Sequence, residues 1–590
     1  MKKLFALLLA VVLVLGLVAC AQPVNPTEPN NDPTTTGKPT TAAPTTTTEP
    51  GVKVEFPLAE EITIKYLVPM STIYKDFKKT LEANKLWQKL YEMTNIKVEL
   101  VQCDDLDTLN AYIQQGSYGD IIACNGVKNA STEASINQLI ASKALLDVNE
   151  YANNPNVMPN LHKYVLAELP EVKGKWMSPD GGLYVFGFYS AEKWKYLESS
   201  CWINKTWLEK ANMTVADVAT FEGLEKFFAW IMANDPNGNG KQDEVPYFCY
   251  ASGGNMIEAL LGSFGMPTKD ATNENYITIE DGEVLFVPQQ TAYKDFLTMM
   301  NKWYTNGWMY KDYFLGHSAT LEAAARDLLW NNNGEPDRIA FYTATSQPAR
   351  VTSSGENDMH PNKDNKCEYI SILPPKAEGY TTEWYMHPGF MGSQGALMVS
   401  AKTQYPAEVC AWIDLFYNED ITVDAINGSE GSAWRVVDKD GKISRLSGIT
   451  AEVEEELRNV KLDLPLRTMI TSLPYATTAN ALENKLTLTD AVIASKNALK
   501  FYEDAGVLND ASEVWPRPYM STENSEEIGE IRGDIMLLVE TYRAESITGK
   551  KNFTSDWDAL QKALKNDVKT ERFVEILQET FDVCMEGSGK

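Results

Sequence analysis

The chain has 590 residues, which is long enough for two or three domains. Its 53 basic and 81 acidic residues give a formal net charge of −28, and this excess of acid argues against binding to nucleic acid, which needs a basic surface. A hydrophobic content of 44% and fourteen tryptophans are ample for globular cores.

The first twenty residues have the pattern of a secretory signal. Met1-Lys2-Lys3 is basic, Leu4–Val18 is apolar, and Leu17-Val18-Ala19-Cys20 ends the run. A run this short with a cationic front predicts a signal peptide and not a membrane span. The small residue before the cysteine resembles the lipobox of bacterial lipoproteins, which implies that Cys20 becomes lipidated. An ordinary cleaved signal with a chance cysteine is the alternative.

Residues 21–56 are rich in threonine, proline and asparagine and have no hydrophobic period. Such a composition cannot bury enough apolar surface to fold, so it predicts a disordered linker. No other long apolar segment follows. The sequence therefore predicts a soluble protein that a lipid tethers through a flexible spacer.

Strand and helix patterns alternate after the linker. Residues 61–68 and 96–101 alternate as strands do, and 119–124 is a short apolar run typical of a buried strand. Helical patterns lie between them and at 138–146, and 181–188 is predicted to be a turn followed by a strand. Strands that alternate with helices predict an α/β fold with a parallel sheet and helices on both faces.

The loop Asp235–Glu244 has the spacing of a calcium site. It follows a helical pattern in which apolar residues share one face, namely Phe221, Leu224, Phe227, Phe228 and Ile231. Oxygen-bearing side chains stand at the first, third, fifth, ninth and tenth positions, and Gly240 at the sixth permits the sharp bend. The predicted ligands are Asp235, Asn237, Asn239, the backbone carbonyl of Lys241, Asp243 and Glu244.

The calcium would have a structural role, because it would join a helix end to the strand that begins near Val245. Position twelve is Pro246 and not glutamate, so a bidentate carboxylate would have to come from Asp243 or Glu244. The alternative is an ordinary polar turn, since Pro-Asn-Gly-Asn-Gly also has strong turn chemistry.

Several short motifs in a fixed order resemble the extracellular solute-binding proteins of bacterial ABC importers, and in particular the alginate-oligosaccharide and other sugar binders. They are LWQKLYEMT at 86–94, GDII at 119–122, WINKTWLEK at 202–210, the loop at 235–244, GSEGSAW at 428–434 with DKDGK at 438–442, and FTSDW at 553–557. The resemblance spans about residues 57–585. Ser429 and Ala433 depart from the larger residues that such proteins often carry.

That resemblance implies a two-lobed, type II periplasmic-binding-protein-like α/β fold, with parallel-rich sheets flanked by helices and a hinge between the lobes. We assign 57–190 and 395–470 to the first lobe, and 191–394 and 471–590 to the second. Segments 186–200, 391–400 and 465–480 are the predicted crossings between the lobes. The last hundred residues read as helices.

The sequence offers no motif of an enzyme. Only four histidines occur, and the spacings of a zinc protease, a serine-hydrolase elbow and a phosphate-binding loop are missing from it. Carboxylate pairs could always be found among 81 acids, so composition does not rule out a glycosidase. We therefore expect binding without turnover.

Sugars need aromatic platforms together with polar hydrogen-bonding groups. Aromatic and polar residues in apparent loops or crossings are the candidate ligand contacts: Tyr189, Trp194, Trp384, Tyr385, Glu430, Trp434, Arg435, Trp515 and Arg517. For any one aromatic residue, a packing role is the alternative, because tryptophan is usually a packing residue. Glu430 could equally cap a turn.

The sequence thus predicts a lipid-anchored substrate-binding component of a carbohydrate ABC importer, monomeric and held at the outer face of the bacterial cytoplasmic membrane. The resemblance implies membrane permease subunits as partners. A secreted carbohydrate-active hydrolase, and a peptide or signalling-ligand binder on the same scaffold, are the alternatives.

Overall fold

The computed structural model describes residues 52–69, 77–123, 132–169, 176–178, 180–193, 197, 199–248, 257–268, 276–310, 313–315, 337–344, 367–386, 397–446, 463–488, 490–509, 515 and 520–587. These ranges lie within one compact unit, Gly51–Lys590. The predicted signal peptide, Cys20 and most of the predicted linker lie outside them. None of the helices in these ranges is both long and apolar enough to cross a membrane.

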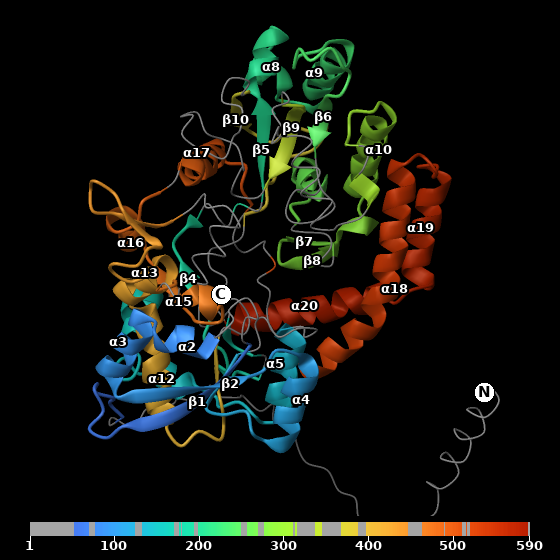
Figure 1. Cartoon of the computed structure of the whole chain (residues 1–590). Coiled ribbons are helices and arrows are strands. Elements are labelled where there is room, and N and C mark those ends of the chain that lie inside the picture. The colour runs from blue at the N-terminus through green and yellow to red at the C-terminus, as the bar shows by residue number, and fades with distance from the viewer. Residues whose placement is uncertain are drawn as a thin grey trace, which may run out of the picture. The chain divides into compact units, whose positions relative to one another are not determined.

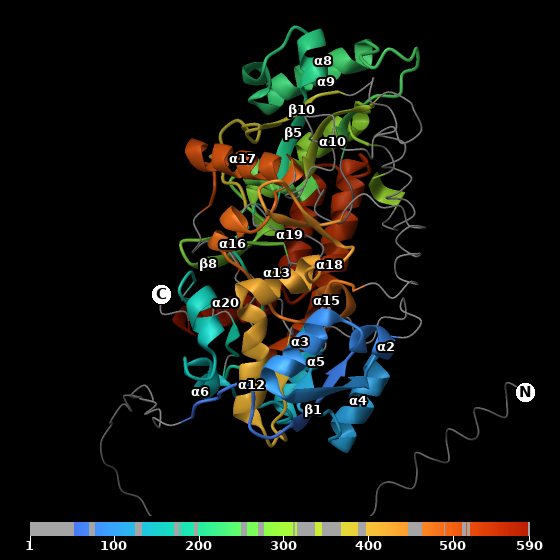
Figure 2. The same cartoon turned by 60° about the vertical axis from the view of Figure 1, so that its left-hand side comes forward.

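The first sheet has the strand order β11-β3-β1-β2, and Figure 1 shows its strands β1 and β2. Strand β1 (Ile62–Val68) runs parallel to β2 (Ile96–Gln102) and to β3 (Ile121–Ile122), while β11 (Met398–Val399) is antiparallel to β3. The elements around it are α2 (Phe77–Glu82), α3 (Lys85–Thr94), α4 (Leu106–Gln115), α5 (Thr132–Ala141), α6 (Asn149–Ala152), η1 (Leu161–Leu166), α12 (Pro406–Asp414) and η8 (Leu415–Tyr417). Figure 2 shows α12 beside this sheet, and α12 contacts β11.

The second sheet has the order β10-β5-β9-β6 and is mixed. Strand β5 (Ser200–Asn204) is antiparallel to β9 (Ile339–Ala344) and β10 (Tyr369–Ile372), and β6 (Val245–Phe248) is parallel to β9. The elements near it in the chain are α8 (Lys205–Lys210), η3 (Val215–Val218), α9 (Phe221–Ala233), η4 (Ile257–Phe264), β7 (Ile277–Glu280), β8 (Glu283–Phe286), η5 (Val287–Gln289), α10 (Thr291–Thr305) and η6 (Tyr313–Leu315).

The remaining elements come from the last third of the chain, apart from β4 (Tyr189–Ser190). They are α13 (Glu419–Asn427), β12 (Arg435–Val437), β13 (Ile443–Arg445), α15 (Leu466–Met469), β14 (Ala476–Thr477), α16 (Ala479–Asn484), α17 (Asp490–Ala505), α18 (Thr522–Ile547), α19 (Ser555–Asn566) and α20 (Thr570–Gly587). The predicted helical C-terminus is confirmed by α18, α19 and α20.

Helix α9 forms where its apolar spacing predicts a helix. Thr220 caps its N-terminus, because the side-chain hydroxyl accepts the backbone N–H of Gly223 at 3.1 Å. All five residues of the predicted apolar face are buried. The helix ends at Ala233, just before the loop Asp235–Glu244, so the core contact of α9 fixes where that loop begins.

The buried apolar residues form two large clusters. One contains strands β1 and β3 with Trp412, and the other contains β5, α9 and the C-terminal helices. Fully burying an aromatic side chain contributes on the order of 2–3 kcal/mol, so these clusters supply most of the stability. Val54 and Phe56, at the end of the predicted linker, pack against the first cluster, so ordered structure begins before residue 57.

The predicted strand at 181–188 is absent as a continuous strand. Leu183 pairs with Met177, and Phe186 pairs with Leu397, as isolated bridges. The segment is apolar enough for a strand, but its backbone groups bond to different partners one at a time. It therefore runs as an extended connection into β4.

A buried carboxylate ties η1 to the end of α12. Asp414 is 1% exposed, and it accepts the backbone N–H groups of Asn160 at 2.9 Å and Leu161 at 2.7 Å, together with the Asn160 side-chain amide at 2.8 Å. Burial raises the pKa of Asp414 to about 6, although these hydrogen bonds oppose the rise.

Asp414 should make stability depend on pH. Its pKa in the folded chain lies above that of an unfolded aspartate, so the folded state binds more protons between pH 4 and 6. This contribution to the unfolding free energy is present below pH 4 and is lost as the pH rises through about 6, with a slope of up to about 1.4 kcal/mol per pH unit.

Urea unfolding from pH 4 to 7 measures that slope, and Asp414→Asn should flatten it. The matched control is Asp534→Asn, which changes an exposed carboxylate on α18 and should leave the slope as it is in the unmodified protein. Equal slopes in the Asp414→Asn variant and the unmodified protein would contradict the assignment.

Candidate functional site

The three predicted crossing segments meet through backbone pairing. Strand β4 runs parallel to β14, and the N–H of Tyr189 donates to the carbonyl of Tyr475 at 2.8 Å. Close by, Phe186 and Leu397 exchange backbone hydrogen bonds of 2.8 and 3.2 Å. Ala191, just after β4, packs against both large clusters. The segment that follows β4 therefore leads from one core to the other, while the division into two lobes stays a prediction.

A pocket of about 690 Å³ lies beside β14. Its walls come from α13, β13, α15, β14, α16 and the start of α17. Aliphatic side chains alternate there with hydrogen-bonding ones, among them Glu192, Asn427, Arg445, Arg467, Tyr475 and several threonines. A pocket of this size, partly apolar and with a few polar groups, suits a small organic ligand or part of an oligosaccharide.

Three side chains from two crossings are stacked at this pocket. The rings of Phe188 and Tyr475 lie 4.7 Å apart and only 6° from parallel. The guanidinium carbon of Arg467 lies 4.1 Å from the centre of the Tyr475 ring. An Arg467 terminal nitrogen also donates to the carbonyl of Thr471 at 2.8 Å. Burial lowers the pKa of Arg467, and the neighbouring Tyr475 partly offsets this effect.

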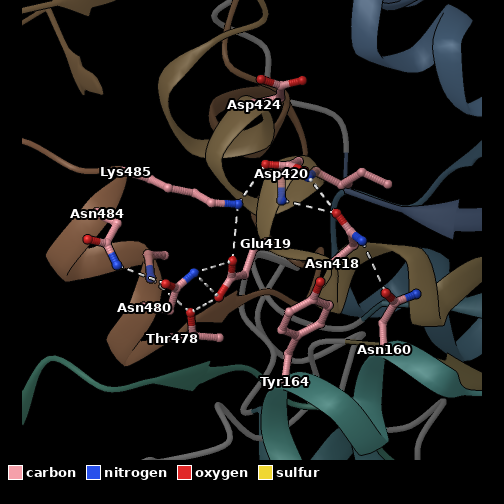
Figure 3. A network of polar contacts seen from close by, with 12 residues as sticks. Asn160, Tyr164, Asn418, Glu419, Asp420, Asp424, Thr478, Asn480, Asn484 and Lys485 are labelled. Carbon is pink, nitrogen blue, oxygen red and sulfur yellow. Dashed lines mark hydrogen bonds and ion pairs between the residues drawn. The ribbon is translucent and has the colours of Figure 1, made fainter. Parts of the chain in front are cut away.

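A network of polar contacts holds α13 to α16, and both helices line the pocket (Figure 3). Glu419 at the start of α13 is 5% exposed, and it accepts hydrogen bonds from the hydroxyl of Thr478 and from the amide of Asn480. It also pairs with Lys485 at 3.0 Å. Burial opposes ionisation of Glu419, but these donors outweigh it and lower its pKa. The carboxylate thus stays charged and fixes the two helices.

The network continues to η1 through Asn418. Its side chain caps α13 by accepting the backbone N–H of Asp420 at 3.0 Å, and its amide donates to Asn160 at 3.2 Å. Asp420 pairs with Lys485 at 2.8 Å. Helix α13, which lines the pocket, is therefore positioned at its N-terminus by both η1 and the segment that carries β14.

Three of the candidate ligand contacts, Tyr189, Trp384 and Tyr385, are packed inside the structure. The hydroxyl of Tyr189 donates to Glu168 at 2.6 Å. Trp384 is 1% exposed, and its indole N–H donates to the carbonyl of Ser199 at 2.6 Å. Tyr385 is also buried. Trp194 and Arg517 lie outside the described residues.

The later candidates are scattered as well. Glu430 is exposed, and its backbone carbonyl accepts from Lys85. Trp434 is 2% exposed beneath the guanidinium of Arg445. Arg435 pairs with Asp424 at 2.6 Å, and Trp515 stacks on Phe581. None of the described candidates lines the pocket, and their contact with a ligand stays a prediction.

Sequence reasoning missed Arg467, Tyr475 and Glu192, which do line the pocket. A usable signal was present, since Arg467 and Tyr475 lie in the predicted crossing 465–480. A crossing segment runs past any site between two lobes, so its polar and aromatic residues were better candidates than tryptophans in loops.

The loop Asp235–Glu244 is folded by its own side chains. The carboxylate of Asp235 accepts the backbone N–H groups of Gly238, Asn239 and Gly240 at 2.7 to 3.2 Å, which lowers its pKa. Asp243 accepts the side-chain amides of Asn237 and Asn239, and lies 3.2 Å from the guanidinium of Arg338. In the described part of the chain, no three carboxylate, imidazole or thiol groups converge as a metal site.

Glu244 is the residue of this loop that a cation would satisfy. It is 8% exposed, and both carboxylate oxygens are buried without a hydrogen-bond partner. Burial raises its pKa, and the negative charges of Asp235 and Asp243 raise it further. A buried carboxylate without a partner is the kind of group that a hard cation such as Ca²⁺ binds, although the three carboxylates of the loop do not converge on one point in this structure.

The two sheets and the paired crossing segments belong to a type II periplasmic-binding-protein-like fold, as the likeness to solved solute-binding proteins shows and as the sequence predicts. No protein-family model matches the chain. The chain is 25% identical over 528 residues to the fructooligosaccharide ABC transporter substrate-binding protein FusA of Streptococcus pneumoniae, covering 87% of this chain and 89% of that protein. The chain is therefore a homologue of the substrate-binding proteins of ABC transporters, which confirms the resemblance found in its sequence.

Solved structures agree on the fold. An EF-hand mutant of FusA from Streptococcus pneumoniae, in complex with fructo-nystose, matches with a TM-score of 0.64 at 19% identity, over 90% of this chain and 100% of that chain. An extracellular solute-binding protein from Bifidobacterium longum subsp. infantis matches with a TM-score of 0.70 at 17% identity, over 89% of this chain and 98% of that one.

Proposed function

We propose that this protein is the substrate-binding component of an ABC importer and that it binds an oligosaccharide. The observation that carries the proposal is the similarity to FusA, which extends over most of both chains. The pocket beside β14 supports it, because it combines hydroxyl, amide and guanidinium groups with aliphatic walls at the point where the crossing segments pair.

The mechanism would be closure of two lobes around the ligand. The crossing segments would bend, and the closed form would be favoured because the ligand contacts both lobes only then. A pocket wall anchored at β14 suits this role, since any movement of the crossing strand changes the position of Tyr475 and Thr477. We propose binding without turnover, in keeping with relatives that are transporter subunits.

A panel of kestose, maltotriose, trigalacturonate and short peptides tests the function. We expect one saccharide class to bind with one-to-one stoichiometry in calorimetry and to raise the melting temperature, with no new reducing ends after long incubation. Release of reducing ends would favour a hydrolase, and binding of peptides alone would favour a peptide binder. Either result would overturn the proposal.

We further propose that the loop Asp235–Glu244 holds a structural calcium ion. The carboxylates of Asp235, Asp243 and Glu244 would supply charge, and the side-chain oxygens of Asn237 and Asn239 with the carbonyl of Lys241 would complete the shell. The buried oxygens of Glu244 support this, and FusA was studied as an EF-hand mutant. The ion would join the end of α9 to β6.

Calcium should stabilise the protein, by about 2.7 kcal/mol when its concentration is a hundred times the dissociation constant. Chelation should therefore lower the melting temperature. Glu244→Gln should shrink that response and, in chelator, should melt higher than the unmodified protein, because a buried unpaired charge is gone. Glu222→Gln, which alters an exposed carboxylate on α9, is the matched control and should keep the full response.

If chelator removes all metal from the protein and the melting temperature does not change, the calcium proposal is wrong and the loop is an ordinary polar turn. Saccharide affinity should change little, since the loop lies at the end of α9 and away from the pocket residues.

Finally, we propose that Cys20 is lipidated and anchors the protein to the outer face of the bacterial cytoplasmic membrane, where permease subunits would be its partners. The lipobox-like residues Leu17–Cys20 support the anchor. Cys20→Ser should shift the protein from the detergent phase to the aqueous phase in a partitioning assay, or leave it unprocessed. Unchanged partitioning would contradict the anchor, and Cys103→Ser serves as the control because Cys103 is buried.

A further inference from the structure

Among the described arginines, Arg467 is partly buried and yet forms no ion pair, whereas Arg445, which lines the same pocket without an ion pair, is exposed. Arg435, Arg543 and Arg572 each form an ion pair with a carboxylate. No carboxylate of the described residues lies within ion-pair distance of Arg467, although acids outnumber bases by 81 to 53. Its side chain is partly buried in the wall of the pocket. A partly buried positive charge without a negative partner is costly unless something else supplies acceptors.

The stack fixes where the guanidinium points. Phe188 lies parallel to Tyr475 at 4.7 Å and covers one face of that ring. A guanidinium carbon 4.1 Å from the same ring centre must therefore lie over the opposite face. The carbonyl of Thr471 holds one end of the guanidinium. Arg467 is thus clamped between an aromatic face and a backbone acceptor at the pocket wall.

The same stack removes Tyr475 as a sugar platform. Tyr475 is the aromatic residue among the described residues that line the pocket, and both of its ring faces are covered. A ligand in this pocket would meet the ring only at its edge. Among the described lining residues, hydrogen bonds and charge therefore contribute more to recognition than stacking of a sugar against a ring.

We propose that Arg467 is a ligand-binding residue that donates to a pair of adjacent oxygen acceptors of a saccharide, and that Phe188 is a positioning residue acting through Tyr475. The proposal rests on the proposed function. The acceptors can be the two oxygens of a uronic-acid carboxylate or two neighbouring hydroxyls of a neutral sugar, since the planar guanidinium fork suits either pair. Phe188 itself is not among the lining residues.

Removing the charge tests the binding role. Arg467→Gln should weaken binding of the saccharide identified by the panel at least tenfold in calorimetry. Arg467→Lys keeps the positive charge but lacks the planar guanidinium fork. Its saccharide affinity should therefore lie between that of the unmodified protein and that of Arg467→Gln. Arg532→Gln, on α18, controls for the loss of one positive charge and should leave affinity unchanged.

The positioning role is tested by coupling. Phe188→Leu keeps apolar volume but removes the stacked ring, and we expect a several-fold loss of affinity in the unmodified background. The same change should have little further effect in Arg467→Gln, because the group that it positions is gone. Phe188→Tyr keeps a stacked ring and should therefore bind the saccharide as tightly as the unmodified protein. Phe227→Leu, which removes the ring stacked on Trp230, is the matched control in the other cluster.

An equal loss from Phe188→Leu in both backgrounds would show a merely structural effect and overturn the positioning role. Unchanged affinity in Arg467→Gln and Arg467→Lys, with saccharide still bound by the unmodified protein, would overturn this proposal alone. No saccharide bound by the unmodified protein would overturn the proposed function as well. If the Arg467 variants lose affinity for trigalacturonate alone, the acceptor is the carboxylate. If they lose affinity for kestose or maltotriose, the acceptor is a pair of hydroxyls.

Discussion

The short parallel pairing of β4 with β14 is the constraint on which the candidate site depends. It joins two segments from opposite halves of the chain by a few backbone hydrogen bonds, and it sets the position of Tyr475 against Phe188. Tyr475 and Thr477, which line the pocket, are held directly by this pairing. The network around Glu419 then holds α13, which also lines the pocket, to the segment that follows β14.

The sequence predicted best those features that local spacing controls. The apolar face of α9 follows from a helical period, and the first parallel strands follow from alternation. The three segments that the family resemblance suggested as crossings pair with one another in the structure, while their role between two lobes stays a prediction. The boundary of the linker was harder to predict, because Val54 and Phe56 pack against residues that lie far along the chain.

The site was harder to predict because its contacts join distant segments. Trp384 was a candidate sugar platform because it is an aromatic residue in an apparent loop. In the structure its indole N–H donates to the carbonyl of Ser199, and its ring lies in a hydrophobic core. Beyond its place in a predicted crossing, Arg467 gives no local signal, because its position depends on the Tyr475 ring, which is in turn stacked on Phe188 from another segment. Only the fold shows that its charge lacks a carboxylate among the described residues.

The pairing of β4 with β14 also has a consequence for the order of events in folding. Contacts between residues far apart in sequence form slowly, because the entropy cost of closing a long loop comes before the contacts contribute any stability. Strands of two residues each are too short to drive that closure alone. We therefore expect both cores to consolidate before the crossing strands meet, and a chain that folds as it is synthesised would have no pocket until its lining residues, which extend to Val492, had all been made.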